Sequence, residues 1–277
     1  MPSRPHPPRI GHVALGGVPR VVLCVTDRRR GRLPGGPRPD LLEARIDLFA
    51  DQRPAAVATA LRRLRQTRLP VIGTIRSAAE GGRWQASEND RLALFEHVLP
   101  LVDAVDVELA SGRLARRIAR VAHARHRRVI VSSHDFTATP TAAMLGRRIR
   151  AARALGADIV KLAAYANGPR DVATLLSVLL AGGRSHVPLV VLAMGPAGTL
   201  SRVFFGAAGS LLTYAFAPGD GATAPGQLSL RELQTELARY YPAAAGRPGS
   251  RSAGKGRPAP RSRPSGTRRR SRRRPRG

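Results

Sequence analysis

Short apolar runs alternate with longer amphipathic stretches between residues 20 and 240. Eight of the runs have the length and the β-branched content of buried strands: 21–26, 41–47, 70–76, 104–109, 128–134, 158–164, 188–195 and 210–216. Apolar residues recur at helical spacing between most of them, as in 55–66, 89–102, 142–156 and 171–183. Strands that alternate with helices predict parallel βα units.

Eight such units in roughly 220 residues fit a closed (β/α)8 TIM barrel of the α/β class. An open doubly wound sheet is the alternative, but no glycine-rich dinucleotide-binding turn follows the first strand. Helix starts are predicted at Ser87 with Asp90 three residues later, at Ser111, and at Thr139 with Pro140 behind it.

The same pattern divides the chain into three parts: an amino-terminal extension over 1–19, the barrel domain over 20–243, and a tail over 244–277 rich in Arg, Pro, Gly and Ser. Residues 246–277 hold 13 basic residues and no acidic one, so they contribute much of the net charge of +29. Such a composition buries nothing, and we expect a disordered tail. The tail could bind polyanions non-specifically, or it could be a solvated extension with no dedicated partner.

The composition also bears on the cellular compartment. The single cysteine, Cys24, permits no disulfide within the chain and fits a reducing cytoplasm, where we expect it to be a small buried hydrophobe. No apolar run approaches the roughly 20 residues that span a bilayer, so no membrane association is expected. The seven histidines show no ligand spacing, and no metal site is predicted.

Charged residues inside the predicted strands are costly, because barrel strands are apolar on both faces. Apart from Arg128 and Asp158, which begin their runs, they lie in the middle or later part of their strands. Glu43, Arg45 and Asp47 share one face at i, i+2 and i+4. Further candidate residues, charged and uncharged, lie on the other strands: Thr74 and Arg76, Asp106 and Glu108, Ser132 and His134, Lys161, Met194, and Thr213 and Tyr214. The carboxyl ends of barrel strands form one mouth, where catalysis is placed.

Each residue alone has a structural explanation: a rim histidine, a Glu43–Arg45 ion pair, or a Lys161 amine that reaches the barrel rim. Their joint placement at one end of the barrel instead predicts an active site.

Lys161 suggests the chemistry. Only two of the 47 basic residues are lysines, Lys161 and Lys255. We expect an apolar, cation-rich barrel to push the Lys161 amine towards its neutral form, which attacks a carbonyl carbon to form a Schiff base. Arginine cannot do this, because it does not lose its proton. His134, on the neighbouring strand, is suited to move protons, and Glu80 could orient its imidazole. These residues predict proton abstraction next to a carbonyl held as an imine.

The remaining candidates concern the substrate. Arg45, Arg76 and Arg202 predict an anionic, carboxylated substrate that also carries hydroxyls.

The fragments "EARID", "TIRSAAEGG", "DVEL", "SSHDF", "DIVKLA", "MGPAGTLSR", "GSLLTYA" and "APGQ" resemble, in order and spacing, the type I 3-dehydroquinate dehydratases over roughly residues 20–240. The resemblance implies a homodimeric TIM barrel that converts 3-dehydroquinate to 3-dehydroshikimate, the third step of the shikimate pathway, without a metal or organic cofactor. It also implies a role for each matching position. Lys161 resembles the Schiff-base lysine that attacks the C3 ketone, His134 the base and acid for the C2 proton and the C1 hydroxyl, and Glu80 its partner.

Binding residues follow from the same match. Glu43, Arg45 and Arg76 resemble the residues that hold ring hydroxyls, Arg202 the arginine that pairs with the carboxylate, Met194 a pocket wall, and Gln227 the residue that closes over the ring. Thr223 stands where the family usually has serine, and residues 27–40 are unusually rich in Arg and Gly.

Two other functions remain compatible with the sequence. Class I aldolase-type barrels also use a lysine on the sixth strand, but an aldolase leaves "SSHDF" with "APGQ" unexplained. A nucleic-acid-binding protein built on an inactive barrel is suggested by the isoelectric point near 11.9, although every matching catalytic position is intact.

Overall fold

The computed structural model describes residues 7–29 and 31–241. The predicted tail, 244–277, lies outside the described residues.

Within the described residues, strands alternate with helices along most of the chain. The strands are β1 (Arg9–Ile10), β2 (Val13–Ala14), β3 (Arg20–Val25), β4 (Leu41–Arg45), β5 (Val71–Thr74), β6 (Ala104–Glu108), β7 (Arg128–Asp135), β8 (Ile159–Tyr165), β9 (Leu189–Met194), β10 (Leu212–Phe216) and β11 (Leu228–Ser229). The α-helices are α1 (Pro54–Arg65), α2 (Glu88–Val98), α3 (Arg113–Ala124), α4 (Ala142–Ala154), α5 (Pro169–Arg184), α6 (Ser201–Phe204) and α7 (Leu230–Tyr240).

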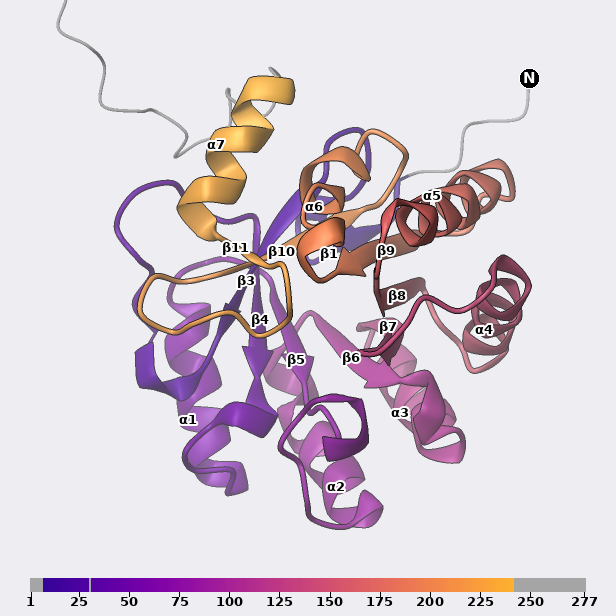
Figure 1. Ribbon diagram of the computed structural model, residues 1–277. Coiled ribbons are helices and arrows are strands. Elements are labelled where there is room, and N and C mark those ends of the chain that lie inside the picture. The colour runs from indigo at the N-terminus through magenta and orange to yellow at the C-terminus, as the bar shows by residue number, and fades with distance from the viewer. Residues whose placement is uncertain (1–6, 30, 242–277) are drawn as a thin grey trace, which may run out of the picture.

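The main sheet has nine strands in the order β11-β10-β3-β4-β5-β6-β7-β8-β9, and neighbouring strands are parallel. Strands β9 and β10 meet where the curled sheet closes: the Leu211 amide donates to the Leu189 carbonyl at 3.0 Å, and the Val191 amide donates to Ser210 Oγ at 3.0 Å. Helices surround the strands on the outside (Figure 1). The predicted barrel fold is confirmed, and each of the eight predicted runs coincides with a strand.

The first βα unit differs from the regular pattern. Strand β3 is followed by a short 3-10 turn, Asp27–Arg29, and the residues described between this turn and β4, 31–40, contain no α-helix. The connecting sequence, "DRRRGRLPGGPRPD", contains glycines and prolines, which destabilise a helix interior. The predicted helix start at Ser87 is confirmed, since its side chain accepts from the Asp90 amide. The starts at Ser111 and Thr139 are wrong, because α3 begins after Gly112 and α4 is capped by Thr141.

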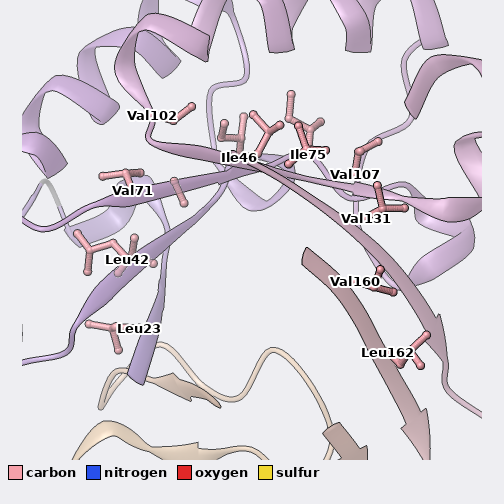
Figure 2. Close-up of a cluster of buried hydrophobic side chains, with 14 of the residues drawn as sticks. Leu23, Leu42, Ile46, Val71, Ile75, Val102, Val107, Val131, Val160 and Leu162 are labelled. Carbon is pink, nitrogen blue, oxygen red and sulfur yellow. The ribbon is translucent and has the colours of Figure 1, made fainter. Parts of the chain in front are cut away.

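Two hydrophobic clusters lie on opposite faces of the strands. The outer cluster joins the strands to the helices, and Figure 2 shows members such as Leu42, Val131 and Leu162. The inner cluster fills the barrel, where Ile10 and Leu15 from the segment around the β1–β2 hairpin pack against strand residues. Residues that were predicted as an extension therefore contribute to the core.

The barrel interior changes character along its axis. We call the inner residues nearest the amino ends of the strands the apolar layer: Val22, Leu41, Ile72, Ala104, Ile130, Ile159, Val190 and Leu212. Two residues further along each strand lies what we call the polar layer: Cys24, Glu43, Thr74, Asp106, Ser132, Lys161, Leu192 and Tyr214. Because side chains alternate along a strand, a step of two keeps the same face. The polar layer lies nearer the carboxyl ends of the strands, where it forms the floor of the candidate active site described below.

Candidate active site

A pocket of about 500 Å³, measured out to its open mouth, lies at the carboxyl ends of the strands. The structure brings all ten predicted site residues to its wall: Glu43, Arg45, Arg76, Glu80, His134, Lys161, Met194, Arg202, Thr223 and Gln227. Five of them lie on four strands, β4, β7, β8 and β9, and the other five lie in the segments that follow β5, β9 and β10, so only barrel closure places them together.

Lys161 is the third residue of β8 and is 5% exposed. Its Nζ donates to Asp106 Oδ2 at 2.9 Å and lies 3.7 Å from Glu43 Oε1. The Tyr214 ring centre is 4.1 Å from the same nitrogen. The expectation of a cation-rich environment is wrong at close range, because the two charged groups that contact the amine are carboxylates.

Asp106 joins the amine to Arg76. Its Oδ1 accepts from Arg76 Nη2 at 3.0 Å and from Ser132 Oγ at 2.6 Å. Burial alone would raise the pKa of Asp106, but the positive charges of Arg76 and Lys161 outweigh it and hold the pKa far below its usual value. Asp106 is therefore a carboxylate that holds Lys161 in place.

His134 is paired with Glu80. Glu80 Oε2 lies 2.9 Å from His134 Nδ1 and accepts from the His134 backbone amide at 3.0 Å. Burial, together with the charges of Arg76 and Lys161, lowers the pKa of His134 well below its usual value, so the imidazole is neutral near pH 7. A proton on Nδ1, donated to Glu80, leaves Nε2 as the acceptor.

Glu80 itself has an unusual environment. Burial and the negative charge of Glu108 outweigh the attraction of Arg76 and raise the pKa of Glu80 to about 7. Its ionisation therefore changes within the physiological pH range.

The three predicted arginines differ in their counterions. Arg45 forms two hydrogen bonds with Asp47, at 3.0 and 2.8 Å. Arg76 pairs with Asp106 and Glu108. Arg202 is 2% exposed, yet within the described part of the chain it has no acidic partner; its Nη2 donates to the Pro225 carbonyl at 3.1 Å, and Nε has no partner. Burial lowers the pKa of Arg202 to about 10. A buried guanidinium without a carboxylate is suited to bind an anion.

The loop between β10 and β11 closes one side of the pocket. Gln227 Oε1 accepts from the Thr223 amide at 2.7 Å and from Thr223 Oγ1 at 3.0 Å. Gln227 Nε2 approaches Cys24 Sγ at 3.5 Å, and that thiol donates to Glu43 Oε2 at 3.1 Å. The departure from serine at position 223 therefore keeps a hydroxyl that holds Gln227.

Sequence reasoning missed three residues of the site. Cys24 was expected to be a plain core hydrophobe, but it lines the pocket, hydrogen-bonds with Glu43, and has its pKa raised to about 12 by burial and by that carboxylate. Asp106 and Tyr214 were noticed on their strands without being assigned a role. The i, i+2 alternation was the available signal, because it places both in the polar layer with Lys161.

Two other kinds of feature are absent from the described residues. Among the helices in 7–29 and 31–241, none combines the length and apolar character that crossing a bilayer requires. His, Cys, Asp and Glu side chains in these same ranges form no group of three that could hold a metal ion.

Comparison with known proteins agrees with this geometry. The model of the type I 3-dehydroquinase family matches residues 36–241. The 3-dehydroquinate dehydratase of Methanosarcina barkeri is 40% identical over 203 residues, which cover 72% of this chain and 84% of the relative. That of Shouchella clausii is 36% identical over 208 residues, covering 72% of this chain and 80% of the relative.

Solved structures give the same result. The 3-dehydroquinate dehydratase of Geobacillus kaustophilus superposes with a TM-score of 0.77 at 30% identity, covering 86% of this chain and 98% of that one. The type I 3-dehydroquinate dehydratase of Clostridium difficile, solved with covalently modified comenic acid, gives 0.77 at 27% identity, covering 85% and 97%. Because the family model matches residues 36–241, which make up most of the chain and contain all ten predicted site residues, the chain belongs to the type I 3-dehydroquinase family and is a hydro-lyase.

Proposed function

We propose that this protein dehydrates 3-dehydroquinate to 3-dehydroshikimate and water through a Schiff base on Lys161. One observation carries the proposal: a primary amine, 5% exposed, at the floor of a pocket that also holds the imidazole of His134. The reaction is the third step of the shikimate pathway, so the chain would serve the synthesis of aromatic amino acids.

The first step joins substrate and enzyme. The deprotonated Lys161 nitrogen attacks the C3 carbonyl carbon, and the carbonyl oxygen leaves as water with both protons of the amine. One further proton, taken from solvent, gives the protonated imine. Asp106 holds the nitrogen before the reaction at 2.9 Å. Its negative charge, with that of Glu43, would stabilise the positive charge of the imine.

Elimination follows from the imine. His134 Nε2 takes the C2 proton, and the electron pair of the C–H bond moves into the imine to give an enamine. The pair then returns to expel the C1 hydroxyl, which takes a proton from the imidazolium and leaves as water. Hydrolysis of the imine releases product and restores the amine. The lowered pKa of His134 supports its role as the initial base, because the free imidazole is unprotonated.

Substrate binding would use side chains that line the pocket. Arg202 would pair with the substrate carboxylate, since it is the predicted arginine that lacks an acidic partner among the described residues. Glu43, Arg45 and Arg76 would hold ring hydroxyls. Gln227, fixed by Thr223, would cover the ring, with Met194 as an apolar wall.

We also propose, from the family resemblance, that the protein is cytoplasmic and forms a homodimer. Sedimentation of the full chain would test whether it is a dimer. The basic tail would bind polyanions non-specifically. Deletion of residues 246–277 should weaken retention on heparin and leave turnover unchanged.

The function is tested by replacing Lys161. Lys161→Ala should lose the ultraviolet signal of the conjugated enone product by several orders of magnitude, because covalent catalysis is removed. Lys161→Arg is the matched variant, since it keeps a positive charge beside Asp106 but cannot form an imine. Borohydride added with 3-dehydroquinate should leave a reduced adduct on Lys161 of the wild type. An unchanged protein mass, or full activity of Lys161→Arg, would contradict the proposal.

An aldolase-type reaction would also pass through a lysine adduct. Product analysis separates the two, because dehydration conserves the carbon skeleton whereas an aldolase splits it.

A further inference from the structure

Tyr214 lies beside the Lys161 nitrogen, and the reaction steps described above give it no role. It lies on β10 in the polar layer, is 3% exposed, and lines the pocket. Its ring centre is 4.1 Å from Lys161 Nζ. An aromatic ring attracts a cation held over its face, and the attraction grows when both groups are removed from water.

The ring interaction would persist through the reaction. The nitrogen over the ring carries a positive charge both as the ammonium and as the protonated imine. It loses that charge in the enamine, when the electron pair from the C–H bond has arrived. The ring therefore interacts more favourably with the two charged states than with the enamine, and one of these states is the imine that activates the C2 proton.

The hydroxyl of Tyr214 also indicates a role in the site. Its oxygen is buried and has no hydrogen-bond partner among the described residues. A buried polar group without a partner is destabilising, so such a group in a binding pocket is expected to gain a partner from a bound molecule. Burial and the nearby charges of Glu43 and Asp106 raise the pKa of Tyr214 well above its usual value. The group is therefore a neutral phenol that can donate a proton.

We propose that Tyr214 is a further catalytic residue, whose ring stabilises the charged nitrogen on Lys161 and whose hydroxyl donates to an oxygen of the bound substrate close to the imine carbon. This inference rests on the proposed function, because it assumes the lysine adduct. A residue used only for packing would leave the hydroxyl without a purpose, since phenylalanine would fill the same space.

The two parts of the proposal are tested by two replacements of similar shape. Tyr214→Phe removes the hydroxyl and keeps the ring; kcat/KM should fall about tenfold, mainly through a higher KM. Incorporation of 3,4,5-trifluorophenylalanine at position 214 then weakens the negative face of the ring with little change in size. Its kcat should fall about a further tenfold below that of Tyr214→Phe, and borohydride trapping should slow. Tyr240→Phe, at a 61% exposed tyrosine on α7, is the control and should match the wild type.

The outcomes are separable. Unchanged KM and kcat in Tyr214→Phe would overturn the hydroxyl assignment, and equal kcat for the phenylalanine and trifluorophenylalanine proteins would overturn the ring assignment. Thermal melting of each variant verifies that it is folded. If the wild type gives no borohydride adduct, the proposed function itself fails; if the adduct forms and the variants behave as wild type, only the role of Tyr214 fails.

Discussion

The apolar and polar layers of the barrel are two residues apart on the same strands, yet they are stabilised in different ways. In the apolar layer, side chains such as Ile72 and Ile130 form one hydrophobic cluster that also includes Ile10 of the hairpin. In the polar layer, Lys161 and Asp106 are as deeply buried, but they form ion pairs and hydrogen bonds. The hydrophobic effect stabilises the first layer, whereas the second avoids a large desolvation cost only because its charges are paired.

This comparison shows how one scaffold carries both stability and chemistry. The apolar layer and the hairpin fix the strands at one end, so that the charged groups at the other end keep their geometry. Above the polar layer, Arg202 is the exception to pairing, because it is buried without a carboxylate among the described residues. An exception at this place is expected where a ligand supplies the missing charge.

Removal of the Arg202 charge should reduce turnover more than a change in the Glu80–His134 pair or in the apolar layer. Arg202→Gln should lower kcat/KM about 100-fold, because the substrate carboxylate would lose a charged hydrogen-bond partner. The unfolding free energy should not fall, since a buried, unneutralised charge is removed. Steady-state kinetics and chemical denaturation measure the two quantities. Arg153→Gln, at an exposed position on α4, is the control, and an equal loss of activity there would exclude a specific role for Arg202.

The Glu80–His134 pair should give a smaller effect that depends on pH. With the pKa of Glu80 near 7, kcat/KM of the wild type should rise as pH increases through about 7, because ionised Glu80 orients the imidazole. Glu80→Gln should lower kcat/KM about 10- to 100-fold and remove this inflection. A pH profile of the variant that keeps the inflection would assign it to another group.

The same pKa has a consequence for stability. A pKa raised above the usual 4.5 means that the folded state binds the proton more tightly. The stabilisation is fully present below about pH 4.5 and is lost as pH rises through about 7. Between these values, the unfolding free energy of Glu80→Gln should fall less with pH than that of the wild type.

A substitution in the apolar layer should lower the stability of the protein and have the smallest effect on turnover. Ile10→Ala should lower the unfolding free energy by about 2–5 kcal/mol, because it leaves a cavity under the barrel. The kcat/KM of the folded protein should equal that of the wild type. Val13→Ala, at a half-buried position of the same hairpin, should cost less. A lower kcat/KM in Ile10→Ala at full folding would show that the two layers are coupled.

The sequence by itself determined the strands and the faces on which their residues lie, because a strand's period of two is a local property. It was sufficient to place Lys161, His134, Glu43 and Arg45 towards the carboxyl ends of their strands and to predict the barrel. Helix starts were less certain: Ser87 was identified correctly, whereas Thr141 was missed by two residues.

Only the tertiary structure decided which groups meet, because closure of the ring joins residues that are distant in the chain. Asp106 holds the Lys161 amine across 55 positions, and Gln227 reaches Cys24 across 203. The absence of a carboxylate beside Arg202 within the described residues is likewise a property of the packed barrel. Local periodicity determines the direction of a side chain, but its partners and its charge environment depend on the three-dimensional arrangement of all the strands.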